Sequence, residues 1–165
     1  MNLIHKILGM SLVIFASCAP DARIPQIFGG PDAIATMNAP DKVEAWRTIA
    51  PHKLEEEKMG GKKVTQTKGK LADYLIIKGP VEVDAQTGAE IAAILQRNQY
   101  KWKPPYVDCL PNPGFAVQYT QGTNSTQIFF CFECGILETY FNGNKSSKIE
   151  FSHDGLRALL TKVSP

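Results

Sequence analysis

The spacing of apolar and polar positions predicts an α+β fold built on an antiparallel sheet. Residues 42–49 alternate as in a half-buried strand, with Arg47 on the same side as the apolar Val43, Ala45 and Ile49. A second strand is expected around Tyr74–Ile77. Further strands are predicted at residues 115–120, 127–133, 136–142 and 149–151. Because these later strands follow one another through short connections, we expect an antiparallel sheet of about five to six strands.

Two amphipathic helices are expected to cover one face of this sheet. Thr87 and Glu90 form a capping box, and Ile91, Ile94 and Leu95 follow at helical spacing, which predicts a helix over residues 88–98. A last helix is expected to begin at Ser152 or Asp154. Its buried stripe comprises Leu156, Leu159, Leu160 and Val163. A short helix is also predicted to begin at Pro31 and to end near Asn38.

Three segments lack such periodicity and are predicted to be irregular. Residues 18–30 are rich in proline and glycine and are interpreted as a tether. Residues 52–70 carry runs of Glu and Lys, which favours a solvated loop. Residues 100–114 contain four prolines, which exclude a regular helix or a central strand. A single domain is therefore expected over residues 31–165.

The first eighteen residues predict export from the cytoplasm. Lys6 precedes ten apolar or small residues, Ile7–Ala16, a length typical of a secretory signal and too short for a membrane-spanning helix. Ala16 and Ser17 before Cys18 resemble a bacterial lipobox, although Phe15 departs from its usual leucine. The prediction is a signal peptide at residues 1–17 and a lipidated Cys18 that anchors the protein to the membrane.

This anchor predicts a location in the bacterial cell envelope. Ala19 rather than aspartate follows Cys18, so the outer membrane is expected, on its periplasmic or surface face. Two alternatives remain open at this point. One is an ordinary secretory signal that contains a cysteine, and the other is a cytosolic protein with an apolar N-terminus.

Three further cysteines, Cys109, Cys131 and Cys134, form the main candidate for chemistry. Exported chains meet oxidising conditions, which favours a disulfide between Cys109 and one of the other two. With a turn centred at residues 123–124, strand register places Cys134 opposite Pro113 and Cys131 opposite Ala116. Either partner is then within reach of Cys109, and Cys134 is slightly favoured.

The same cysteines allow three other interpretations. Cys131-Phe-Glu-Cys134 resembles half of a zinc knuckle, which Cys109 and His153 could complete. A redox pair is a second possibility, but the two cysteines lie on a predicted strand rather than at a helix N-terminus. The third is that all three are inert core residues. No cofactor is expected.

The remaining sequence gives little indication of catalysis. A formal net charge of +2 over 165 residues gives no reason to expect nucleic acid as a partner. Phosphate-binding, dinucleotide-binding and metalloprotease motifs are absent from the sequence. His52 and His153 are interpreted as surface residues, and Glu82 and Asp84 as carboxylates on a solvent face. The aromatic residues Trp46, Tyr100, Trp102 and Tyr106 either line a recognition surface or pack onto the core.

Three motifs together resemble a group of uncharacterised bacterial exported or lipid-anchored proteins. They are Asp41–Arg47, Cys109 with Pro113-Gly114, and Phe130-Cys-Phe-Glu-Cys134. The resemblance implies that the cysteines act as a unit and implies no mechanism. We therefore expect a non-catalytic binding module with a protein or small-molecule partner. The alternative is a metal- or thiol-dependent envelope protein that uses Cys109, Cys131 and Cys134, and a small hydrolase comes third.

Overall fold

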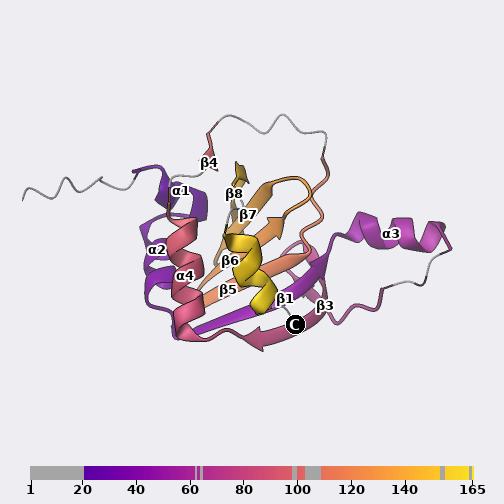
Figure 1. Ribbon diagram of the computed structural model, residues 1–165, viewed down its shortest axis with the longest axis horizontal. Helices are drawn as coiled ribbons and strands as arrows, with labels where there is room; N and C mark the ends of the chain where they lie inside the picture. Colours follow the sequence, from indigo (N-terminus) through magenta and orange to yellow (C-terminus); the bar gives the residue numbers. More distant parts are fainter. Residues whose placement is uncertain are drawn as a thin grey trace, which may run out of the picture.

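The computed structural model describes residues 21–61, 63, 65–97, 100–102, 109–152, 155–163 and 165. These residues form one antiparallel sheet of eight strands, in the order β2-β3-β1-β5-β6-β7-β8-β4, together with five helices (Figure 1). The strands are β1 (Lys42–Ile49), β2 (Lys70–Leu71), β3 (Tyr74–Glu82), β4 (Tyr100–Lys101), β5 (Phe115–Gln121), β6 (Asn124–Cys131), β7 (Ile136–Phe141) and β8 (Asn144–Phe151). The helices are α1 (Ile24–Phe28), α2 (Pro31–Asn38), α3 (Pro51–Met59), α4 (Ala85–Leu95) and α5 (Leu156–Lys162).

The expected fold of five to six strands with two amphipathic helices is therefore wrong, because the described residues are largely β and include five short helices. The two additional edge strands, β2 and β4, have two residues each and are too short to show alternation. The additional helices α1 and α3 lie in the segments expected to be a tether and a charged loop. None of the helices in the described ranges has the length and apolar composition that a membrane span requires.

One face of the sheet packs against four of the helices and forms the main core. Alternate residues of the central strands, such as Val117, Ile128 and Leu137, are fully buried on this face. Helices α1, α2, α4 and α5 supply the other side of the core, whereas α3 extends away from the sheet (Figure 1). Two buried threonines of the sheet form hydrogen bonds with helices α1 and α2. The Thr126 hydroxyl donates to the Ala33 carbonyl over 3.3 Å, and the Thr139 hydroxyl donates to the Ile27 carbonyl.

The first helix belongs to this core and not to a tether. Ile24, Ile27 and Phe28 of α1 are at most 3% exposed and pack in the main cluster. Gly29 follows α1 with φ +108°, and a Cβ there would lie 2.6 Å from Cβ of Phe141. Glycine is therefore required where α1 lies close to β7. The prediction of a tether up to residue 30 is therefore wrong for residues 24–28, because these form α1 and belong to the folded domain.

The opposite face of the sheet carries a smaller aromatic cluster. Phe129 on β6 contacts Tyr74 at a ring-centroid distance of 4.9 Å and Tyr140 on β7 at 5.4 Å. Tyr74 lies on β3, which β1 and β5 separate from β6 in the strand order. The sheet is therefore curled, so that the start of β3 covers this face.

An irregularity in β1 contributes to this curl. The pairing of β1 with β3 shifts register on both sides of Arg47, and such bulges bend a strand and redirect its side chains. Gly79 on β3 lies opposite, with φ +102°, and a Cβ there would come within 2.7 Å of the Ala45 carbonyl oxygen. The close approach of β3 to β1 therefore depends on glycine at this position.

Several predicted boundaries shift for local reasons. The charged segment 52–70 contains α3, which begins at Pro51, a favoured first helical residue. Helix α4 begins at Ala85 rather than at residue 88, because Asp84 is its N-cap and accepts a 2.9 Å hydrogen bond from the Thr87 amide. The Thr87–Glu90 capping box is therefore wrong. Helix α5 begins at Leu156, and β8 extends from Asn144, well before the predicted start at residue 149.

Candidate functional site

The predicted disulfide joins Cys109 to Cys134, with their Cα atoms 6.2 Å apart. This confirms the disulfide and the slight preference for Cys134 over Cys131. Cys131 is a free thiol at the end of β6 and is 1% exposed. The bond therefore attaches the segment that precedes β5 to the turn that connects β6 with β7.

The observed register between β5 and β6 differs by two residues from the predicted register that suggested this disulfide. Ala116 pairs with Phe129, and not with Cys131, because the turn between β5 and β6 is centred one residue earlier than expected. A shift of two keeps every side chain on its predicted face. The predicted strand 127–133 also ends at Cys131, so Cys134 lies in the turn, where it can reach Cys109.

Hydrogen bonds attach the same segment to β1. The Thr48 hydroxyl donates to the Pro113 carbonyl over 2.7 Å, and the Ala50 amide donates to the side-chain oxygen of Asn112 over 2.9 Å. The Arg47 Nε donates to the Gly114 carbonyl over 2.9 Å. Residues 109–114 are thus held at one end by the disulfide and at the other by β1.

A groove opens beside this segment, between β1, the turn after β6, and α5. It consists of adjoining cavities of about 240 and 380 Å³, which share Arg47, Gly114, Phe132 and Arg157. We call it the arginine groove. The smaller cavity is further lined by Phe115, Leu160 and Thr161. The larger is further lined by Thr48, Ile49, Glu57, Thr65, Ile77, Asn112, Phe130 and Glu133.

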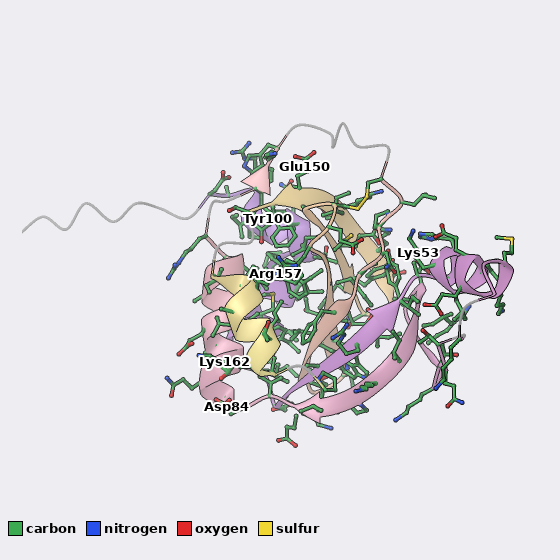
Figure 2. All side chains as sticks on the ribbon, turned by 45° about the vertical axis from the view of Figure 1, so that its right-hand side comes forward. Lys53, Asp84, Tyr100, Glu150, Arg157 and Lys162 are labelled. Carbon is green, nitrogen blue, oxygen red and sulfur yellow. A yellow bond between two sulfur atoms is a disulfide. The ribbon has the colours of Figure 1, made fainter. Side chains whose placement is uncertain are left out.

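Two cationic side chains face the smaller cavity. One of them, Arg157, projects from α5 (Figure 2), and its guanidinium carbon lies 5.4 Å from the ring centroid of Phe132, a distance typical of a cation–π contact. The other is Arg47.

Two carboxylates line the larger cavity. That of Glu57 accepts hydrogen bonds from the Thr65 amide and hydroxyl, at 2.8 and 3.1 Å. The other, Glu133, is solvent-exposed.

A second polar cluster lies on the opposite face of the sheet, around Glu138. This carboxylate is 3% exposed, accepts a 2.7 Å hydrogen bond from the Tyr74 hydroxyl and pairs with Lys145 at 2.8 Å. The Tyr140 hydroxyl donates to Asp73 over 2.7 Å. Burial, and then the adjacent carboxylates, raise the pKa of both tyrosines above their usual value. The polar groups of this cluster are paired with one another and hold the β2–β3 turn against the sheet. The role of the cluster is therefore structural.

The other candidate residues do not form one site. Cys18, Tyr106 and His153 lie outside the described residues. Trp46 is buried, and the Tyr100 hydroxyl donates to the Leu95 carbonyl, so these two pack the core. Trp102 contacts the Arg23 guanidinium, 4.0 Å from the ring centroid.

The polar candidates are equally dispersed. Asp84 caps α4, Glu82 ends β3, and His52 lies at the start of α3. Within the described ranges, no cluster of three or more His, Cys, Asp or Glu side chains is arranged to hold a metal.

Sequence reasoning missed Arg47 and Arg157 as site residues. Arg47 did carry a signal, since it falls on the apolar side of a predicted strand, where a charged residue requires an explanation. Arg157 lies next to the apolar stripe of a predicted helix and carries no distinguishing pattern. Their proximity depends on where α5, which packs against α4, lies relative to β1, and this is a long-range property.

No family model, curated protein or solved structure matches this chain.

Proposed function

We propose that this protein is a lipid-anchored, non-catalytic binding module of the bacterial cell envelope, and that the arginine groove is its ligand site. The N-terminal pattern ending at Cys18 supports the anchor and the export. The Cys109–Cys134 disulfide supports an oxidising compartment.

The groove is the observation that carries the binding role. Ligand sites are concave, largely apolar and contain a few fixed polar groups. The smaller cavity of the arginine groove has this character, with Phe115, Phe132 and Leu160 beside two guanidinium groups. The disulfide and the hydrogen bonds from β1 hold its walls in place, so the site is formed before a ligand arrives.

A thiol- or metal-dependent role has weaker support. It would require Cys109, Cys131 and Cys134 as free thiolates near one another. Two of these sulfurs are joined in a disulfide, and the third belongs to a buried side chain. A binding role uses the cysteines as structural groups instead.

The binding role is tested by blocking the groove. Gly114 lines both cavities, and a Cβ at this position would meet no atom within 4 Å, so Gly114→Leu fills the groove without a backbone clash. Small molecules that stay bound to the purified protein are identified by mass spectrometry after denaturation. We expect wild type to retain a molecule that Gly114→Leu loses. Ala93→Leu, at an exposed position on α4, is the matched control and should retain it.

Two results would contradict the binding role. One is a wild-type protein that retains no molecule, and the other is an identical set of molecules in wild type and Gly114→Leu. The folded state of each variant is checked by its thermal unfolding midpoint.

The anchor is tested separately through Cys18. Mass spectrometry of the N-terminal peptide should show a diacylglyceryl group on Cys18 in wild type. Cys18→Ser should leave the precursor unprocessed and unlipidated. An unmodified Cys18 in mature wild-type protein, or wild-type protein that fractionates with the cytosol, would contradict the anchor.

A further inference from the structure

We infer that the smaller cavity of the arginine groove binds an organic anion, a carboxylate or phosphate group attached to an apolar ring or chain. The inference rests on the proposed function, because it names the ligand class of the same site. The two guanidinium groups would hold the oxyanion, and the aromatic wall would hold the apolar part.

Arg47 is held in one orientation beside the smaller cavity. Its Nε–H is committed to the Gly114 carbonyl, which fixes the plane of the guanidinium beside the cavity. Among the described residues it makes no other side-chain hydrogen bond, so its two Nη groups are available as donors. A planar, oriented guanidinium matches the geometry of carboxylate and phosphate groups.

Arg157 lies on a different element from Arg47. It lines the same cavity from α5, at the Phe132 ring. Phe132 is part of the turn that the disulfide restrains through Cys134. The two cations therefore line one cavity from different elements, and the disulfide restrains the turn whose Phe132 ring lies beside Arg157.

The ion pairs among the described residues include neither Arg47 nor Arg157. The described lining of the smaller cavity contains no carboxylate. An anion that entered here would relieve the repulsion between like charges, whereas a neutral ligand would not.

Apolar side chains also line the smaller cavity. Phe115 and Leu160 are buried core residues whose surfaces reach the cavity, and Phe132 is half-buried beside them. These side chains would remove apolar surface of the ligand from water. The site therefore favours an aromatic or aliphatic anion over a free inorganic ion.

The test measures binding of small probes to the purified protein by NMR titration at low ionic strength. Benzoate and phenyl phosphate are the two anionic probes, and they distinguish the carboxylate from the phosphate source. Benzyl alcohol is the neutral probe, and inorganic phosphate lacks the ring. We expect at least one aromatic anion to bind more tightly than both benzyl alcohol and inorganic phosphate.

The arginines are tested with matched variants. Arg47→Gln and Arg157→Gln should each weaken binding of the aromatic anion about tenfold or more, as expected for loss of a charged hydrogen bond. Arg47→Lys keeps the charge but loses the planar fork, and it should also weaken binding. Arg97→Gln removes the same charge at an exposed position outside the groove, at the end of α4, and should leave the affinity unchanged.

Failure of the inference is distinguishable from failure of the proposed function. Equal affinity of wild type, Arg47→Gln and Arg157→Gln for the aromatic anions, or no binding of either anion by wild type, would overturn the inference. If Gly114→Leu nevertheless removes a retained neutral molecule, the binding function stands and only the ligand class is wrong. If no molecule is retained and no probe binds, both are wrong.

Discussion

Tyr74 on β3 donates a 2.7 Å hydrogen bond to Glu138 on β7, although β1, β5 and β6 separate the two strands in the sheet order. The curled sheet brings them together, and Lys145 supplies the charge that balances the buried carboxylate. A buried carboxylate that loses a partner is costly, so this contact contributes to the stability of the fold.

Tyr74→Phe should lower the free energy of unfolding by about 1–3 kcal/mol, because Glu138 loses a buried donor while the ring contact with Phe129 is kept. Urea unfolding measures the change. The double variant Tyr74→Phe with Glu138→Leu removes both partners and should cost less than the sum of the two single variants. Strict additivity would show that the two side chains are not energetically coupled.

Stability should fall as the pH rises above about 10, the usual pKa of tyrosine. Burial raises the pKa of Tyr74, Tyr100, Tyr119 and Tyr140 in the folded state. The unfolded chain therefore loses protons that the folded chain keeps, so the unfolded state becomes favoured as the pH increases. Unfolding free energies at several pH values on both sides of this pKa test the slope. Tyr119→Phe should reduce the dependence of the unfolding free energy on pH. An unchanged dependence would contradict its attribution to the buried tyrosines.

Removing the disulfide should destabilise the protein and loosen the groove. Cys109 and Cys134 are 25 residues apart, and a loop of this size predicts a loss of about 3.5 kcal/mol in the Cys109→Ala/Cys134→Ala variant. The same variant should bind the aromatic anions more weakly. In a Cys18→Ser chain, thiol titration should detect one thiol, that of Cys131, and only after unfolding. Three titratable thiols in a protein purified without reductant would contradict the bond.

Gly29→Ala should be more destabilising than Gly30→Ala. Both glycines have positive φ, so both substitutions strain the backbone. Only at Gly29 would the added Cβ collide with Phe141 and Ser146, whereas no atom lies within 4 Å at Gly30. Overpacking adds about 1–3 kcal/mol, which thermal or urea unfolding can resolve. Equal effects would show that α1 does not pack closely on β7.

Two of the hairpin strands were the most predictable part of the fold. The strands predicted at residues 115–120 and 136–142 lie within one residue of β5 and β7, because each is a short, mostly buried run rich in β-branched and aromatic residues. Helix α1 was missed because five residues are too few to show a helical period. Helix α3 was missed because its composition is that of a solvated loop, and Leu54 is its one buried residue.

The site was less predictable than the fold. The disulfide could be inferred because the predicted export favours oxidised cysteines and the predicted strand order limits the possible partners of Cys109. The groove could not, since Arg47 and Arg157 are far apart in the sequence and meet only through the bulge in β1 and the position of α5. Glu138 was hidden for a related reason, because its partner Tyr74 reaches it only in the curled sheet.

The bond between Cys109 and Cys134 has a consequence for when the protein can act. It fastens the two loops that bear Gly114 and Phe132, so the proposed ligand site is completed by an oxidation reaction rather than by folding alone. Under the proposed export, newly made chains in the reducing cytoplasm would carry an unfinished pocket. Ligand capture would then begin after translocation, which would separate synthesis from activity in time and in place.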